Sequence, residues 1–446
     1  MIEQSNKLTQ RDKKILIYIL ASAFIIKIIF ALLLQVDIRS DSLDYYNLAK
    51  SIVETGTYSL DGKPTAYLVC GYPLFLASIF KIFGDSIFAV KLIQSFLEIF
   101  TGLFFFLASS YFFKPRYSLI ALVIFTFLPS NLLYSQTILT EPLYGFLFSV
   151  IFYYCLKENI NKNIIFVGIL WGLTVLIRSS FAISFLLMAS FIVIYRRKLF
   201  EGFKLNRMKR AVQYVLLFLV GFLIAVAPWI IRNKITMNTF TLATQGGFTF
   251  WAGSNPDATG TWYHNIVESN PLFKIEDEVL RDKEFYKQGI EYAVKNPHKY
   301  FITGIKKIGY LFSSERMILL YFAKTEKGQN STEVYRSINP LLIALVNIPY
   351  FIIMLIGTWG LLAFEKKRFF IYGFILTWCL TFFIFVALAR YHYVLISFFV
   401  LGTVKFLSER KTIFKKLGGF KIASAIVFNV FLLVVWFIEF YLLITK

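Results

Sequence analysis

Several acidic side chains of this sequence lie at the boundaries of long apolar segments. Asp41 and Asp44 follow the apolar segment 15–36, and Glu141 precedes another in TILTEPLYGF. A carboxylate at such a boundary can accept a proton from an incoming hydroxyl group. Asp41 could equally be a helix N-cap, and Glu141 could favour a helix dipole. We interpret Asp41 as both a cap and a general base, with Asp44 as the next candidate for the base and both readings of Glu141 left open.

Three arginines lie at the corresponding ends of other apolar segments. Arg178 separates two short apolar runs, Arg232 ends another run, and Arg390 lies between two more. Any one of them could extend to lipid head groups from the end of a membrane-spanning helix. However, arginine is disfavoured outside the cytoplasm, and its planar guanidinium is well matched to phosphate. Three arginines at one level therefore favour a binding site for a lipid phosphate.

The composition indicates the elements that must position these residues. Of 446 residues, 57% are hydrophobic and only 16% are charged, whereas soluble domains carry about 25% charged residues. Because one membrane span needs roughly 20 mostly apolar residues, we expect an all-α polytopic membrane protein with about eleven transmembrane helices. The candidate spans are 15–36, 86–112, 117–135, 142–156, 164–177, 179–195, 212–231, 341–364, 369–389, 393–408 and 422–444.

The charged residues between these segments predict an orientation. With the N-terminus in the cytoplasm, the cytoplasmic connections are short and rich in Lys and Arg, as the positive-inside rule requires. Segments 37–85 and 232–340 then lie outside, the first with two amphipathic helices, one of them beginning at Pro73. We expect three parts: a transmembrane module 1–231, an extracytoplasmic region 232–340, and C-terminal transmembrane helices 341–446. The protein would be a multi-pass plasma (inner) membrane protein whose site faces away from the cytoplasm.

The net charge, the cysteines and the histidines argue against several classes of protein. A net charge of +21 indicates membrane topology here rather than nucleic-acid binding. Three cysteines and three scattered histidines form no disulfide framework and no zinc motif. We expect no cofactor, although Asp41, Asp44 and Glu141 could supply oxygen ligands to a divalent ion. The short cytoplasmic connections lack a glycine-rich phosphate-binding loop, which argues against a nucleotide-sugar site there.

Seven motifs occur in one order along residues 41–399: DSLDYYNLAKSIVETGTYS, GYPLFLASIFKIFG, LTEPLYGFLF, GLTVLIRSSF, APWIIRNKITMNTF, TQGGFTFWAGSNPDATG and RYHYVLISFF. Together they resemble integral-membrane glycosyltransferases of the GT-C class. More narrowly, they are similar to glycosyltransferase family 39, to protein O-mannosyltransferases and to lipid A aminoarabinose transferases.

The resemblance implies a reaction and roles for particular residues. A sugar would pass from a polyprenyl-phosphate donor to a glycan, lipid or protein acceptor outside the cytoplasm, with inversion at the anomeric carbon. Asp41 matches the acidic base of the first outer loop, and Glu141 matches a second acidic position. Arg178, Arg232 and Arg390 match basic positions near the donor phosphate. The candidate substrate-binding residues are Tyr45, Tyr72, Asn255 and Tyr391.

Two other function classes remain open at this point. A lipid or polysaccharide transporter or flippase would use charged groups within the spans, and Lys27, Lys91 and Glu98 are the candidates. A surface-polysaccharide polymerase or ligase would also have many spans and a large outer loop. If the protein is a glycosyltransferase, we expect it to tolerate loss of Lys27 far better than loss of Asp41. The identities of the sugar, the acceptor and the lipid chain do not follow from the sequence.

Overall fold

The computed structural model describes residues 8–157, 163–199, 204–262, 270–323, 331–365 and 368–445. These residues are mainly helical, and the strands among them are the short antiparallel pair β1 (Ser59–Leu60) and β2 (Lys63–Pro64). The predicted all-α fold is confirmed. Each predicted apolar segment overlaps one main helix: α1 (Gln10–Leu33), α4 (Ile87–Ser109), α5 (Pro115–Thr126), α7 (Glu141–Leu156), α8 (Ile164–Ile177), α9 (Ser184–Leu199), α10 (Lys204–Met237), α17 (Pro340–Leu362), α18 (Arg368–Ile384), α19 (Tyr393–Glu409) and α21 (Gly419–Thr445).

Six helices of the described residues are long and apolar enough to cross a bilayer, so the chain is an integral membrane protein. They are α1, α4, most of α10, α17, α19 together with the turn before it, and α21. Helices α5, α7, α8, α9 and α18 are apolar but shorter. The total of about eleven spans therefore stays a prediction.

The predicted span 117–135 is not one helix. Helix α5 ends at Thr126, and a separate short helix, α6 (Pro129–Tyr134), begins at Pro129. Proline has no N–H group and disfavours helical backbone in the residue before it, which explains the break. Unpaired carbonyl groups are costly within a membrane, and here buried side chains satisfy several of them. Lys27 Nζ donates to Asn131 O at 2.7 Å, and Gln94 Nε2 donates to Thr137 O at 2.6 Å.

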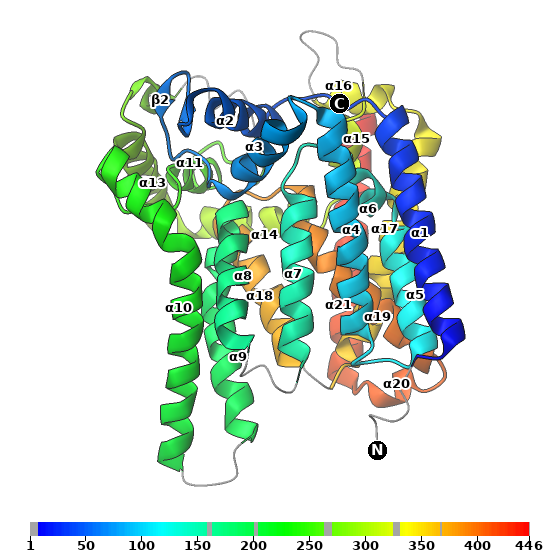
Figure 1. The fold of residues 1–446 in the computed structure, drawn as a ribbon. Helices are drawn as coiled ribbons and strands as arrows, with labels where there is room; N and C mark the ends of the chain where they lie inside the picture. The colour runs from blue at the N-terminus through cyan, green and yellow to red at the C-terminus, as the bar shows by residue number, and fades with distance from the viewer. Residues whose placement is uncertain are drawn as a thin grey trace.

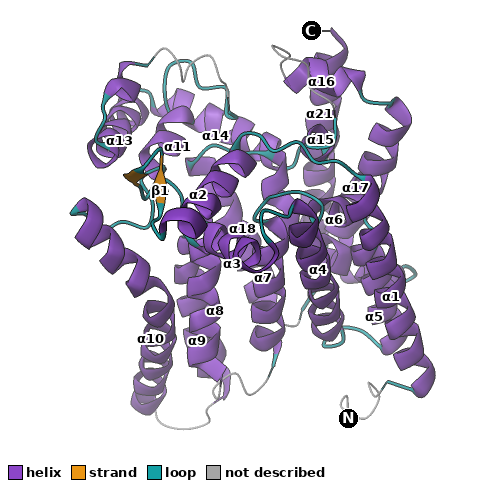
Figure 2. Cartoon of the chain, turned by 45° about the horizontal axis from the view of Figure 1, so that its top comes forward, coloured by secondary structure: helices purple, strands orange, loops and turns teal. Residues whose placement is uncertain are grey.

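The helices of the two predicted outer loops gather at one end of the long helices, which we call the loop end (Figure 1). Figure 2 shows the same arrangement after rotation. Helix α1 begins at the opposite end, where α20 (Ile413–Lys416) also lies. The further short elements are α2 (Asp41–Thr55), α3 (Gly71–Phe83), η3 (Ser179–Ala182), α11 (Gly246–Ala252), η4 (Pro271–Lys274), α13 (Glu278–Lys295), α14 (Pro297–Leu311), α15 (Arg316–Leu320), α16 (Ser331–Ser337) and η5 (Ala389–His392). Helix α3 begins two residues before Pro73, which therefore lies within its first turn.

The two outer loops are joined to each other at the loop end. Phe248, Trp251, Leu272 and Phe285 form a small apolar core between α11, η4 and α13. Glu278, the first residue of α13, accepts hydrogen bonds from Thr65 Oγ1 and from the backbone N–H of Ala66, both at 2.7 Å. Region 232–340 thus packs on segment 37–85 rather than standing apart from it.

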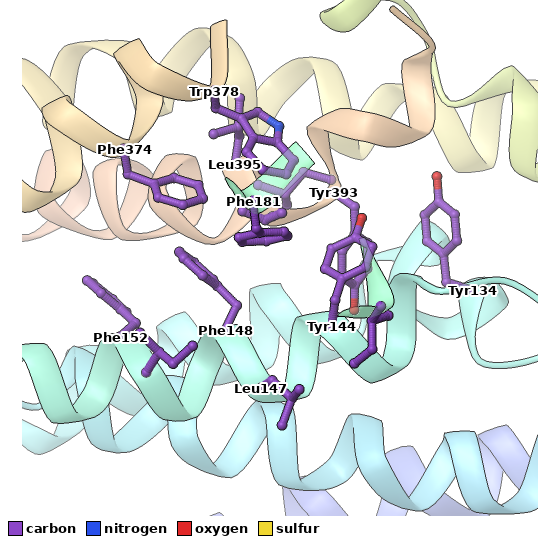
Figure 3. Close-up of a cluster of buried hydrophobic side chains, with 14 of the residues drawn as sticks. Tyr134, Tyr144, Leu147, Phe148, Phe152, Phe181, Phe374, Trp378, Tyr393 and Leu395 are labelled. Carbon is purple, nitrogen blue, oxygen red and sulfur yellow. The ribbon is translucent and has the colours of Figure 1, made fainter. Parts of the chain in front are cut away.

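A cluster of buried aromatic side chains supports the first turn of α7 (Figure 3). The ring centroids of Phe148 and Phe374 are 4.5 Å apart, and those of Phe181 and Trp378 are 4.7 Å apart. Tyr144, one turn before Phe148 on α7, packs against Phe181 at 5.6 Å. These contacts fix α7, and with it Glu141, relative to α18 and η3.

The orientation predicts which introduced cysteines a membrane-impermeant reagent can reach in intact cells. Lys63 is exposed in β2 at the loop end, and Lys114 is exposed in the turn between α4 and α5 at the opposite end. In a chain whose native cysteines are replaced by alanine, we expect labelling of Lys63→Cys but not of Lys114→Cys. Permeabilised cells provide the control, since both sites should then react. Labelling of Lys114→Cys alone in intact cells would reverse the predicted orientation.

Candidate functional site

Four of the predicted site residues meet at the loop end, although they come from separate parts of the chain. Arg390 Nη2 donates to the carboxylate of Asp41, and Arg178 Nη1 lies 3.3 Å from Glu141 Oε1. Arg390 Nε lies 3.9 Å from the same oxygen of Glu141. We call Asp41, Glu141, Arg178 and Arg390 the charged cluster.

Breaks in the helices place these four side chains. Asp41 and Glu141 are the first residues of α2 and α7, Arg178 is the residue at which α8 ends, and Arg390 lies in the short turn η5 before α19. A helix N-terminus carries partial positive charge, which favours both carboxylates. Each of these four predicted residues thus lies at or next to a helix end, while their roles stay predictions.

Burial in the charged cluster increases from Asp41 inward. The exposed fraction of the side chain is 37% for Asp41, 12% for Arg178, 5% for Arg390 and 0% for Glu141. Two positive and two negative charges balance, as buried ionised groups require. Asp41 is thus the member of the cluster that an entering molecule can reach first.

Aromatic side chains surround the two arginines. The guanidinium of Arg178 lies over the ring of Tyr391 at 4.1 Å and over that of Tyr144 at 5.2 Å, both within the range of cation–π attraction. Arg390 Nη1 donates to the hydroxyl of Tyr321 at 3.4 Å. Tyr391 was a predicted site residue, whereas Tyr144 and Tyr321 were missed. Tyr144 lies in the quoted LTEPLYGF motif, but no sequence signal marks Tyr321.

Asp41 does not cap α2, so that part of the prediction is wrong. The N-cap residue is Ser40, which makes no side-chain cap hydrogen bond, and Asp41 is already within the helix. Ser40 has a φ of 52°, a conformation that is uncommon for residues other than glycine. Segment 37–39 is held by hydrogen bonds to a distant part of the chain. Arg39 donates to Leu320 O, and the N–H of Asp37 donates to Tyr321 O at 2.9 Å. Segment 320–321 therefore positions Asp41 next to Arg390.

The two aspartates of α2 differ in acidity. Burial raises the pKa of Asp41, but the charge of Arg390 and its hydrogen bond lower the pKa more, so that it lies below the ordinary value. Burial and the neighbouring charge of Asp41 raise the pKa of Asp44 to about 6. Near neutral pH the aspartates are both mainly ionised, and Asp44 becomes protonated first when the pH falls.

Arg232 lies elsewhere and has a different set of contacts. Its Nη1 donates to Thr65 O at 2.6 Å, and its Nη2 donates to Tyr58 O at 2.7 Å. The guanidinium also lies over the rings of Tyr58 and Trp229. Arg232 thus binds the first outer loop to α10, and its predicted role at a phosphate has no support from these contacts.

The other predicted substrate-binding residues are buried and packed. Tyr45 and Tyr72 meet edge to face at 5.0 Å, and the hydroxyl of Tyr72 donates to Gln94 Oε1 at 2.8 Å. Asn255 is 3% exposed and stabilises the turn after α11, where its Nδ2 donates to Trp251 O at 2.9 Å. Tyr45 directly follows Asp44 on α2, while Asn255 has no described contact with the charged cluster.

Four buried donor groups around Glu141 have no hydrogen-bond partner among the described residues. They are Arg178 Nε, Arg390 Nε and the hydroxyl groups of Tyr134 and Tyr144. Both tyrosines are at most 1% exposed. Unpaired buried donors are rare in proteins, so this end of the bundle can offer several hydrogen bonds to an anion.

A second buried pair joins η5 to the residue before α15. His392 Nε2 is 3.2 Å from Glu315 Oε1, and the ring of His392 stacks on Tyr350 at 4.7 Å. His392 Nδ1 lies 2.8 Å from the carbonyl oxygen of Leu311, which can only accept a hydrogen bond, so Nδ1 is the donor. These contacts fix η5 and therefore the side chain of Arg390, two residues earlier. Sequence analysis identified neither residue.

The charged residues within the spans have structural partners. Lys27 is 1% exposed and donates to Asn131 O and to Ser135 Oγ in the broken segment after α5. Glu98 is 3% exposed and accepts from the hydroxyl of Tyr393. Loss of Lys27 should therefore damage folding whatever the function is. Comparing Lys27 with Asp41 no longer separates a transporter from a glycosyltransferase.

The similarity of this chain to known proteins is distant and lies among solved structures. No protein-family model and no curated protein matches the sequence. Among solved structures, the chain is similar to the crystal structure of ArnT from Cupriavidus metallidurans bound to undecaprenyl phosphate. The two have 11% sequence identity and a TM-score of 0.45, and the alignment covers 89% of this chain and 78% of that chain. The likeness is too distant to assign a role to any residue of the charged cluster.

Proposed function

We propose that the protein is an integral-membrane glycosyltransferase that takes a sugar from a polyprenyl-phosphate donor. The observation that carries the proposal is the charged cluster at the loop end. Two largely buried arginines lie there beside a partly exposed carboxylate, at the end of an apolar bundle. A lipid donor suits this distribution, because its chain can stay among apolar helices while its phosphate meets the arginines. The motif order that resembles GT-C enzymes supports the same function.

The proposed reaction is a single displacement. The oxygen of an acceptor hydroxyl attacks the anomeric carbon, and the bond from that carbon to the donor phosphate oxygen breaks. Asp41 accepts the hydroxyl proton, and polyprenyl phosphate leaves with the bonding electrons. Attack opposite the leaving group inverts the anomeric carbon. Arg178 and Arg390 would stabilise the charge that develops on the phosphate, which is the contribution that a divalent ion could otherwise make.

The acceptor would approach from the loop end, where Asp41 is accessible. With the orientation predicted from the basic connections, that end lies outside the cytoplasm, so the acceptor would be a glycan, lipid or protein of the cell envelope. Tyr45 and Tyr391 are the predicted substrate-binding residues closest in sequence to the cluster and are the first candidates for contacts to the sugar or the acceptor.

The donor class is tested with purified protein in lipid nanodiscs. We expect sugar transfer from a polyprenyl-phosphate sugar and none from the matching nucleotide sugar, because the described connections opposite the loop end are short. Replacing Arg390 by Lys should weaken donor binding about 10- to 100-fold, since a bidentate contact to a charged group contributes roughly 1.5–3 kcal/mol. Transfer from the nucleotide sugar without a lipid carrier would contradict the proposal.

A further inference from the structure

Asp41 covers the guanidinium group of Arg390. The side chain of Arg390 is 5% exposed, whereas that of Asp41 is 37% exposed. Arg390 Nη2 donates to Asp41, Nη1 donates to the hydroxyl of Tyr321, and Nε faces Glu141. The carboxylate of Asp41 therefore lies between the arginine and anything that enters from the loop end.

A phosphate needs the same donor atoms that Asp41 occupies. Arginine binds carboxylates and phosphates alike through two parallel N–H groups. Every possible pair in Arg390 includes at least one nitrogen that already has an oxygen in place, from Asp41 on Nη2 or from Tyr321 on Nη1. The hydroxyl of Tyr321 is neutral, so a phosphate can displace it from Nη1 at little cost in free energy. The carboxylate of Asp41 is an anion, and it competes directly with a phosphate.

We propose that Asp41 and the donor phosphate bind Arg390 in exchange, so that arrival of the donor detaches Asp41 and releases its carboxylate toward the acceptor. This inference rests on the function proposed above, which assigns the phosphate to Arg390. One carboxylate–guanidinium contact is lost and one phosphate–guanidinium contact forms. No covalent bond changes, and no proton moves in this step.

The exchange would activate the base only when the donor is present. While Asp41 is paired, Arg390 holds the pKa of its carboxyl group below the ordinary value against the effect of burial. A carboxylate stabilised in this way is a weak proton acceptor. Once a phosphate neutralises Arg390, burial remains the main influence and the pKa of Asp41 rises. A stronger base then faces the acceptor at the moment when the anomeric carbon is in place.

The test measures binding of undecaprenyl phosphate to the full-length protein in nanodiscs, with undecaprenol as the probe that lacks the phosphate. Asp41→Asn removes the competing anion, and we expect it to bind the phosphate about tenfold more tightly, the effect of one lost charge-assisted hydrogen bond. Asp44→Asn is the matched control. It makes the same charge change three residues further along α2, and no described contact joins Asp44 to Arg390. We expect its affinity to change less than about twofold.

A double variant tests whether the gain in affinity for undecaprenyl phosphate depends on Arg390. In an Arg390→Gln background, Asp41→Asn should no longer tighten binding, because the two anions have no shared partner left. If wild type binds undecaprenyl phosphate better than undecaprenol but Asp41→Asn binds no more tightly, the exchange is wrong and the proposed function stands. Undecaprenyl phosphate and undecaprenol could instead bind equally well, and Arg390→Gln could leave binding unchanged in a chain that elutes as a single folded species. The exchange and the proposed function would then both be wrong.

Discussion

Asp41→Asn should lower the turnover number by about 10²- to 10⁴-fold, the usual contribution of a general base. Asparagine has nearly the same size and cannot accept the proton of the acceptor hydroxyl. Asp41 makes no cap hydrogen bond in α2, so the substitution removes no helix cap. The variant should therefore fold, and its loss of activity should come from chemistry. Turnover is measured at saturating polyprenyl-phosphate sugar, and chromatographic profile and thermal unfolding report the fold.

Asp44 is the rival base, and pH separates the two residues. The pKa of Asp44 is raised to about 6, whereas that of Asp41 is lowered. Because kcat/KM reports groups of the free enzyme, a reaction that needs ionised Asp44 should slow about tenfold per pH unit below 6. If Asp41 is the base, that decline should be absent or small, and Asp44→Asn should keep most of the turnover. A variant Asp41→Asn with near-normal turnover would refute the assignment.

Much of the bundle could be predicted from the sequence, because one physical requirement dominates it. A membrane span must be apolar over its length, so apolar runs marked the positions of α1, α4, α7, α8, α10 and the C-terminal helices. Arg178 and Arg390 could be recognised because each interrupts such a run. The break in the predicted span 117–135 could also be predicted from the sequence, because Pro129 lies inside the apolar run. A hydropathy profile alone does not reveal this break.

The contacts of the site depend on information that a single sequence does not display. Asp41 and Arg390 are 349 residues apart and meet only through the packing of the whole bundle. Arg232 has the same sequence signature as Arg390, yet backbone carbonyls of the first outer loop occupy its guanidinium. Glu315 and Tyr321 flank α15, a helix too short to show a periodic pattern, so nothing in their neighbourhood distinguishes them from other loop residues. Which arginine joins the charged cluster is decided by tertiary structure.

Replacing Glu141 should have a large effect on stability. This structural effect must be separated from any effect on catalysis. The carboxylate of Glu141 is fully buried, 3.3 Å from Arg178 and 3.9 Å from Arg390. Glu141→Ala leaves two buried guanidinium groups with one carboxylate. Removing one partner of a buried ion pair typically costs about 3–5 kcal/mol, so we expect a clear fall in the thermal unfolding temperature in detergent. Glu141→Gln should fall less, because the amide oxygen can still accept a hydrogen bond.

The double variant Glu141→Gln, Arg178→Gln then decides what the pair contributes. It removes one charge of each sign and keeps two side chains of similar size, so the charged cluster is neutral again. We expect its unfolding temperature to recover most of what Glu141→Ala loses, since replacing both partners of a buried ion pair is often nearly neutral for stability. Turnover should stay low, because the guanidinium that would stabilise the leaving phosphate is absent. If turnover recovers together with stability, Glu141 and Arg178 only hold α7 to α8, and Arg390 alone would remain as the candidate for the donor phosphate.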